Sequence, residues 1–240
     1  MKPRISLVVP AHNEEAFLPG CLEAARQAGE RSGEVIETIV VLNRCTDATE
    51  RIAGEHGCVI VREDAKNLSA IRNAGVAAAS AEIVVTCDAD SRMHPDSFIE
   101  ILRLLAGPDL VGGGAMVLPE RWSVGIVASA AAVLPYLVLS GVSFGMFWFR
   151  KKDFDEIGGF DERFVSVEDL DFAQRLKAHG RLTGRRWGTL WRAPLETSCR
   201  KFDQFGDWYL FRNPGFVRKV FRGTDRKAAD HFWYDVRSGS

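Results

Sequence analysis

Residues Ala81-Glu82-Ile83-Val84-Val85-Thr86-Cys87-Asp88-Ala89-Asp90-Ser91 carry the pattern that decides the fold. The apolar run up to Cys87 predicts a strand, and two carboxylates follow it with one residue between them. Open α/β sheets bind their ligands outside the carboxyl ends of the strands. Carboxylate oxygens also suit a hard divalent cation. We therefore expect Asp88 and Asp90 to bind a cation and a diphosphate.

A second acidic cluster lies about eighty residues later, at Val167-Glu168-Asp169-Leu170-Asp171. Apolar residues then recur at helical spacing through Leu176, so the cluster predicts the first turn of an amphipathic helix. A carboxylate here can take a proton from a substrate, which makes Asp169 a candidate general base. If Asp90 and Asp169 act on one substrate, both must face one pocket.

Composition limits the class of protein. The chain has 240 residues, 46% of them hydrophobic, which is enough for one large domain. Its 31 basic and 32 acidic residues nearly cancel, so we expect no nucleic-acid partner. Five cysteines without a paired C-x-x-C indicate reduced thiols in a cytoplasmic protein. The first strand follows the N-terminus directly, and we identify no export signal.

Strand and helix patterns alternate along the first part of the chain. The apolar runs are too continuous for strands wetted on one face, so they predict a mostly parallel sheet with helices on both sides. The expected strands are Ile5–Val9, Glu37–Leu42, Val59–Val61 and Ile83–Thr86; the expected helices contain Phe17–Ala25, Ile52–Ala53, Ser69–Ala79 and Phe98–Leu105. A glycine run, 111–115, precedes a further strand-like stretch, Met116–Leu118.

The stretch from Trp122 to Phe149 contains no charged residue. Three interpretations fit it. The one we favour is a buried or acceptor-lining helix followed by a strand from Phe144 to Arg150. The others are a helix lying on a membrane surface and a transmembrane span. A single span would put Asp90 and Asp169 on opposite sides of a bilayer, and Pro135 interrupts the run.

In this order and spacing, the motifs resemble family 2 of the inverting nucleotide-sugar glycosyltransferases, which have the GT-A fold. The resemblance covers about residues 4 to 180. It rests on Val8–Glu15, Asn43–Thr49, Ile71–Gly75 leading into Asp88–Asp90, and Gly158–Glu162 leading into Glu168–Asp171. Thr197–Phe202 is similar to a segment that follows the catalytic helix in some bacterial members.

The resemblance implies a nucleotide site. Its nucleotide-binding candidates are Pro10, Ala11, His12, Asn13, Glu14, Asn43, Arg72, Asp88 and Arg200. Many members have an acidic residue at the position of Leu42, so the chain departs from the pattern there. Simpler explanations remain for some of these residues, since Asn13 and Asp47 are good helix caps and Arg72 can be a solvated helix residue.

The resemblance also implies roles for the acidic clusters. Asp90, with Asp88, would bind Mn²⁺ or Mg²⁺, and Asp169 would deprotonate the acceptor hydroxyl. A further metal ligand is often a late histidine, for which we prefer His231 because we expect His179 at a helix-ending turn.

We therefore expect a metal-dependent inverting glycosyltransferase whose donor is a nucleoside diphosphate sugar. The acceptor is either lipid-linked or membrane-proximal, or soluble, and peripheral contact with a membrane stays open. A sugar-phosphate nucleotidyltransferase and a catalytically silent nucleotide-sugar sensor or scaffold are the alternatives. The predicted domain covers residues 1–200, with a nucleotide-sugar half (1–95) and an acceptor half (96–200). We expect residues 201–240 to form a helical, basic and aromatic extension that packs on the domain or on a membrane surface.

Overall fold

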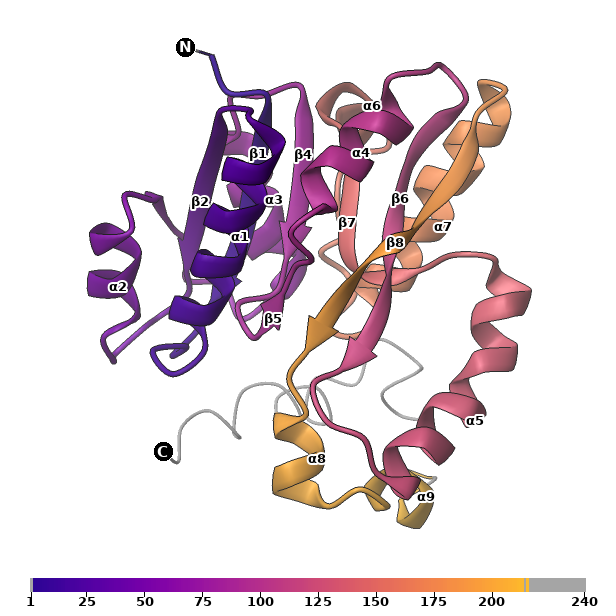
Figure 1. The fold of residues 1–240 in the computed structure, drawn as a ribbon. Coiled ribbons are helices and arrows are strands. Elements are labelled where there is room, and N and C mark those ends of the chain that lie inside the picture. Colours follow the sequence, from indigo (N-terminus) through magenta and orange to yellow (C-terminus); the bar gives the residue numbers. More distant parts are fainter. Residues whose placement is uncertain (1, 214, 216–240) are drawn as a thin grey trace.

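The computed structural model describes residues 2–213 and 215 and is built around one eight-stranded sheet (Figure 1). The strand order is β3-β2-β1-β4-β7-β6-β8-β5. The strands are β1 (Ile5–Ala11), β2 (Ile36–Leu42), β3 (Val59–Arg62), β4 (Ile83–Cys87), β5 (Ser91–Arg92), β6 (Leu110–Pro119), β7 (Phe144–Arg150) and β8 (Arg186–Thr197). The helices are α1 (Leu18–Ser32), α2 (Thr49–Glu55), α3 (Leu68–Ala78), α4 (Ser97–Leu105), α5 (Val124–Ser140), α6 (Lys151–Glu156), α7 (Glu168–Leu182), α8 (Arg200–Phe205) and α9 (Tyr209–Arg212).

The predicted fold class is confirmed. β1 pairs in parallel with β2 and β4, and β2 pairs in parallel with β3. β7 joins the sheet antiparallel to β4 and β6, while β6 and β8 are parallel. The first four predicted strands and the four helices between and after them are all present. β5, β8 and α6 were not predicted, while α8 and α9 fall in the predicted helical extension.

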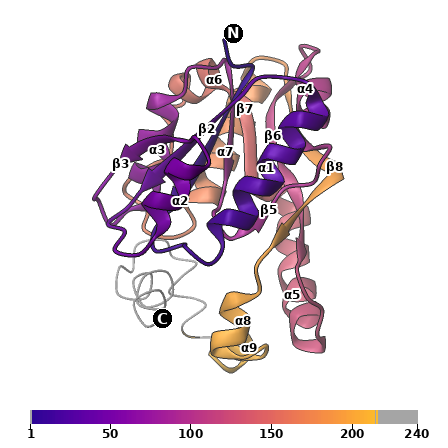
Figure 2. The same cartoon turned by 60° about the vertical axis from the view of Figure 1, so that its left-hand side comes forward.

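Helices cover both faces of the sheet (Figures 1 and 2). One buried cluster joins the sheet to α1, α2 and α4, and the other joins it to α3, α6 and α7. The central strand β1 alternates between them, since Leu7 and Val9 belong to the first cluster and Val8 to the second. All seven residues of β1 are buried, as expected for a strand covered on both sides.

Gly75 sets how closely α3 packs on the sheet. A Cβ at this position would lie 2.3 Å from the Cγ1 atom of Val8 and 2.7 Å from the Cγ2 atom of Val41. The helix therefore approaches the strands at a distance that only glycine permits. This close packing fixes the position of Arg72, one turn earlier on the same helix.

The uncharged stretch forms a helix and a strand, as in the favoured interpretation, but the helix is not buried. Val124 and Leu139 of α5 are 77% and 86% exposed. None of the helices within residues 2–213 and 215 combines the length and apolarity needed to cross a bilayer. Pro135 lies inside α5 and does not end it. The expected helix end at His179 was also wrong, because α7 continues to Leu182.

Candidate active site

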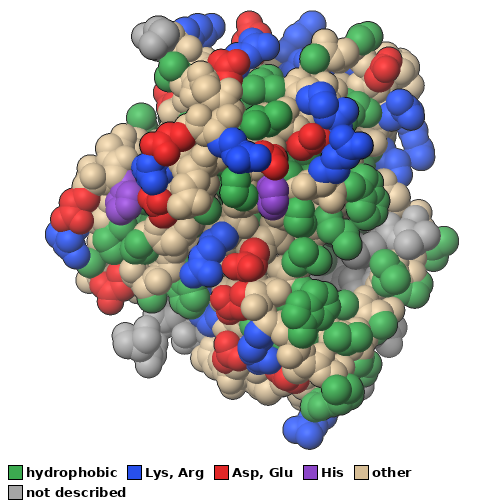
Figure 3. Space-filling model, in the orientation of Figure 1, with side chains coloured by type: hydrophobic (Ala, Val, Ile, Leu, Met, Phe, Trp, Pro, Cys, Tyr) green, Lys and Arg blue, Asp and Glu red, His purple; other side chains and the backbone are tan. Residues whose placement is uncertain are grey.

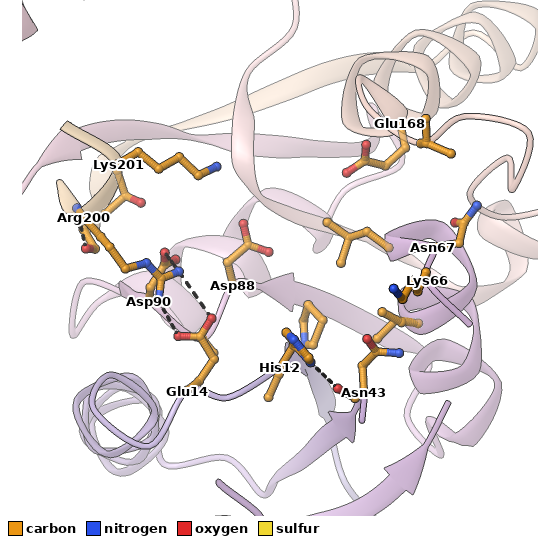
Figure 4. A pocket seen from close by; sticks show the side chains of 18 of the residues that line it. His12, Glu14, Asn43, Lys66, Asn67, Asp88, Asp90, Glu168, Arg200 and Lys201 are labelled. Atoms are coloured by element: carbon orange, nitrogen blue, oxygen red, sulfur yellow. Dashed lines mark hydrogen bonds and ion pairs between the residues drawn. The ribbon is translucent and has the colours of Figure 1, made fainter. Parts of the chain in front are cut away.

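A cavity of about 260 Å³ opens at the carboxyl ends of β1, β2 and β4 and is closed on one side by the start of α8 (Figure 4). Most of the predicted nucleotide-site residues line it: Pro10, Ala11, His12, Glu14, Asn43, Asp88, Asp90 and Arg200. Asn13, Arg72 and Asp169 are not among the lining residues. Most of the residues predicted from the sequence to bind the nucleotide therefore line the same cavity. Their contacts with a substrate stay predictions.

Asp90 is joined to the late segment Thr197–Phe202 by a short antiparallel pairing. Ser91 pairs with Thr197 across β5 and β8, and the backbone N–H of Ser198 donates to the carbonyl of Asp90. Arg200 then reaches back between two carboxylates. Its guanidinium lies 2.9 Å from Asp90 Oδ2 and 2.9 Å from Glu14 Oε2.

Glu14 and Arg200 are both shielded from water. The Glu14 side chain is 2% exposed and that of Arg200 18%. The guanidinium also lies over the Phe17 ring, 4.7 Å from its centroid. Burial opposes the charge on Arg200, but the hydrogen bonds to Glu14 and the charge of Asp90 outweigh it and raise its pKa. This corner of the cavity therefore holds a positive charge between carboxylates.

Arg72 connects the two acidic clusters. Its side chain is 3% exposed, with Nη2 2.9 Å from Asp88 Oδ1 and Nη1 3.0 Å from Glu168 Oε1 and 2.5 Å from Asp169 Oδ1. One guanidinium thus contacts a carboxylate of each cluster, while the expectation that Asp90 and Asp169 face one pocket stays a prediction, since Asp169 does not line the cavity. The positive charge expected at a diphosphate is instead directed at carboxylates, and Arg72 is not a solvated helix residue.

The environment of Asp169 favours its protonated form. Burial raises the pKa of Asp169, and the charge of Arg72 opposes this effect. The nearby Glu168 and Asp88 also raise the pKa, and the net result is a value of about 7. The side chain keeps 29% of its surface exposed, so a proton donor can reach it. A carboxyl group that titrates near neutrality is suited to general base catalysis.

The turn before α7 is strained. Val167 has φ 58°, a left-handed conformation that a β-branched residue rarely adopts. Such strain persists only where the surrounding structure enforces it, and it is frequent at active sites. Here it directs the acidic first turn of α7 toward Arg72, and those acids also interact favourably with the helix dipole.

Two of the sequence motifs are joined through Asn73. Its side-chain amide donates to the carbonyl of Phe160 at 2.9 Å and accepts from the Phe160 N–H at 2.9 Å. Phe160 in turn lies beneath Arg72, whose Cζ is 5.4 Å from the ring centroid. The motifs at 71–75 and 158–162 therefore form one unit that supports the arginine.

The first loop is largely structural in its contacts. Asn13 has φ 51°, and its side-chain oxygen accepts from the N–H of Thr46, so it joins the loops after β1 and β2. Nδ1 of His12 lies 2.5 Å from the carbonyl of Asn43. Asn43 is fully buried, with its amide donating to the carbonyls of Glu63 and Ala65. These bonds shape the wall of the cavity.

Some lining residues were not among the predicted site residues. Lys66 and Asn67 come from the loop before α3, and Lys201 follows Arg200 on α8 (Figure 4). Glu168, part of the second acidic cluster, also lines the cavity and is 8% exposed. The position of Lys66 after the third parallel strand was a usable signal, since such loops meet at the same edge of the sheet.

A cluster of Asp153, Glu156 and His179 has a spacing that can hold a metal ion. It lies by α6, at the end of the sheet where the parallel strands begin, opposite the cavity (Figure 1). Arg185 already binds both carboxylate oxygens of Asp153, at 2.6 and 2.7 Å. A second cation there would be repelled, so we assign no metal to this cluster. His231, the predicted further ligand, lies outside the described residues.

A mixed sheet with helices on both faces and carboxylates at the carboxyl ends of parallel strands agrees with the GT-A type of fold. Comparison with known proteins gives the family. The model of glycosyl transferase family 2 matches residues 6–158, and the chain belongs to this family. The match is to a family of glycosyltransferases and not to the sugar-phosphate nucleotidyltransferases named above as an alternative.

Curated relatives share part of the chain. An uncharacterised glycosyltransferase of Mycobacterium tuberculosis is 37% identical over 110 residues, which cover 45% of this chain and 47% of that protein. The chain thus spans less than half the length of the curated relatives that it matches first.

Solved structures confirm the fold. S. aureus TarS 1–349 in complex with UDP-GlcNAc is similar with a TM-score of 0.64 and 14% identity, over 98% of this chain and 71% of that one. The mannosyltransferase PcManGT of Pyrobaculum calidifontis, in complex with GDP-Man and Mn²⁺, is similar with a TM-score of 0.63 and 19% identity. That match covers 82% of this chain and 57% of PcManGT.

Proposed function

We propose that this protein transfers a sugar from a nucleoside diphosphate to an acceptor hydroxyl, with inversion at the anomeric carbon and with the help of a divalent cation. The observation that carries the proposal is the cavity in which Asp88, Asp90 and Arg200 meet the loops after β1 and β2. His12 and Asn43 would bound the nucleoside end, and Lys201 and Arg200 the diphosphate end (Figure 4).

The residues present fit a divalent cation. Asp88 and Asp90 offer oxygen ligands, and their side chains are 41% and 19% exposed. The guanidinium of Arg200 between Asp90 and Glu14 marks a place where these carboxylates stabilise positive charge. A bound Mn²⁺ or Mg²⁺ would neutralise the charge that develops on the diphosphate. We expect Asp90 and Asp88 to hold it.

Asp169 is the proposed base. It takes the proton of the acceptor hydroxyl, whose oxygen forms a bond to the anomeric carbon while the bond from that carbon to the diphosphate oxygen breaks. The nucleoside diphosphate leaves with the electron pair. Arg72 is a positioning residue, because it fixes Asp169 and Asp88 relative to one another. Glu168 supports the same arginine.

A membrane-proximal or lipid-linked acceptor is supported by the exposed, uncharged α5. Arg121, which precedes α5, pairs with Asp203 of α8, the helix that carries Arg200 and Lys201 of the cavity. The exposed apolar helix is therefore connected to the α8 side of the cavity by this ion pair.

Nucleotide binding gives the first test. We expect UDP or GDP to raise the melting temperature in the presence of Mn²⁺, because a ligand at a hundred times its Kd stabilises a fold by about 2.7 kcal/mol. Asp90→Asn should remove the metal-dependent part of the shift. Asp96→Asn is the matched control, since it removes a carboxylate that pairs with Arg31 on the surface. If neither nucleotide shifts the melt with or without the metal, the proposal fails.

Transfer itself separates an enzyme from the silent sensor. Wild-type protein should release nucleoside diphosphate from a cognate sugar donor, and NMR of the product should show the inverted anomeric configuration. Asp169→Asn should bind the donor yet release almost no product. Unchanged turnover in this variant would refute the assignment of the base.

A further inference from the structure

Helix α5 presents an apolar stripe to solvent. Val124, Val127 and Leu134 recur at helical spacing and are 77%, 50% and 56% exposed, and Leu139 near the end of the helix is 86% exposed. The opposite side packs on the protein through Gly125, Ile126 and Ser129. Exposure of a continuous apolar stripe of this kind is unusual for a protein surface that has no partner.

Aromatic side chains extend this stripe at one end. Trp122 lies just before α5 and is 65% exposed, and Trp208 and Phe211 of the α9 region are 42% and 46% exposed. α9 lies beside the start of α5 in both views, where a Cβ on Gly125 would meet Asp207 at 2.6 Å (Figures 1 and 2). Figure 3 shows hydrophobic side chains gathered over this part of the molecule. We call α5 together with Trp122, Trp208 and Phe211 the apolar face.

The sequence that follows the apolar face is basic. From Arg212 to Lys227 it contains six basic residues and one acidic residue: Arg212, Arg218, Lys219, Arg222, Arg226 and Lys227, with Asp225. Of these, Arg212 alone belongs to the described residues. At the end of α5, the Nζ atom of Lys177 donates to the carbonyls of Ser140 and Gly141. An anionic bilayer suits an apolar stripe that continues into a basic sequence.

We propose that the apolar face docks α5 in the plane of an anionic lipid bilayer. The helix has 17 residues and is ~25 Å long, which is short for a span but enough to lie along the interface. Tryptophan is favoured at that depth. Docking would hold the α8 side of the cavity close to the lipid headgroups. This surface goes beyond the proposed transfer chemistry and does not depend on it.

Vesicle flotation with the full chain tests the proposal. We expect binding to vesicles of phosphatidylcholine mixed with phosphatidylglycerol, much weaker binding to phosphatidylcholine alone, and release by salt. The variant Val127→Glu/Leu134→Glu should reduce the partition coefficient at least about tenfold, since each lost apolar side chain costs that much or more. The matched control is Val59→Glu/Leu182→Glu, which adds the same charge at exposed apolar positions outside the apolar face, on β3 and α7, and should bind like wild type.

Three results would overturn the proposal. One is no flotation of the wild type with anionic vesicles, as expected if the apolar face is covered within the chain. Another is equal loss in both double variants, which would reflect net charge alone. The third is sedimentation of the wild type as a dimer that the α5 variant dissociates, because the face would then bind a second copy. None involves turnover, so each is distinguishable from failure of the proposed function.

Discussion

Arg72 is the residue whose removal should reveal most about how the site is built. Arg72→Met keeps a long unbranched side chain but removes the one cation that touches Asp88, Glu168 and Asp169. At neutral pH the variant would leave three carboxylates close together, two of them shielded from water. We expect the fold to lose stability and Asp169 to stay protonated near neutral pH, where it then cannot accept a proton, because both effects depend on the same guanidinium.

The size of the loss follows from burial. Breaking a buried ion pair by removing one partner costs about 3–5 kcal/mol. Asp88 is 41% exposed, so its share is screened and small, and the main contribution comes from Glu168 at 11% and Asp169 at 29%. We expect about 3 kcal/mol near pH 8. For a domain of this size that lowers the melting temperature by about 6–12 °C.

The loss should depend on pH. The pKa of Asp169 in the folded protein is already raised to about 7, and without the charge of Arg72, which lowers it, that pKa rises further, so the folded variant keeps this proton to higher pH. A group of this kind adds stability at low pH and loses it as pH rises through the folded-state pKa. The difference between wild type and Arg72→Met should therefore be small at about pH 5 and grow as pH rises through about 7 to about pH 8.

Differential scanning fluorimetry at about pH 5 and about pH 8 measures the melting temperatures of wild type and Arg72→Met. Arg163→Met is the matched control, since Arg163 pairs with Asp161 but is 87% exposed, and its melting temperature should stay close to that of wild type at both values. The reasoning is refuted if Arg72→Met melts like this control at the higher pH. A loss of equal size at both pH values would show that packing on Phe160, and not charge, is what Arg72 contributes.

Three further outcomes follow from the geometry. With Asp169 titrating at about 7, the transfer rate should fall as pH drops below that value, and a flat rate down to about pH 5 would count against it. Gly75→Ala should destabilise the fold by about 1–3 kcal/mol in urea unfolding, because its Cβ meets Val8 and Val41, whereas Gly54→Ala in α2, with open space, should stabilise slightly. Arg200→Ala should bind Mn²⁺ more tightly in the absence of nucleotide, since Asp90 loses its competing cation. The same variant should bind nucleoside diphosphate more weakly. Calorimetry that shows no change in either affinity would contradict this.

The parallel half of the sheet was predictable because local signals and tertiary structure agree there. Each apolar run is followed by polar residues and a helical pattern, and strands buried on both faces leave that signature. β8 was missed for a physical reason. It contains Gly188 and Pro194, and its pairing with β6 shifts register between Ala115 and Val117. Proline in a strand is tolerated at such irregularities, but it hides the strand in the sequence.

α5 shows a different limit. An uncharged sequence predicts that the helix is removed from water. It does not indicate whether the helix is covered by the rest of the protein or by another apolar phase. The helix is apolar nearly all round, so periodicity could not identify an inner face. Only the structure shows that Gly125, Ile126 and Ser129 pack inward.

For the site, sequence patterns identified the acidic residues and also Arg72 and Arg200, but not the ion pairs between them. The position of Arg72 depends on the close packing at Gly75, and that of Arg200 on the pairing of β5 with β8, so neither contact could be predicted from spacing alone. The two arginines are not equivalent. Arg72 is 3% exposed on a rigid helix, while Arg200 is 18% exposed at the start of a short one.

Because of this difference, the two aspartates Asp88 and Asp90 are not equally free to move when a ligand binds. Asp88 is tied through Arg72 to Asp169, so its position changes only if the base moves as well. Asp90 is tied to Arg200, which a cation can replace, because a cation at Asp90 would repel the guanidinium and release it toward a diphosphate. We therefore expect donor binding to rearrange the Asp90 side of the cavity and to leave the Asp88–Arg72–Asp169 side as the fixed reference against which the acceptor is positioned.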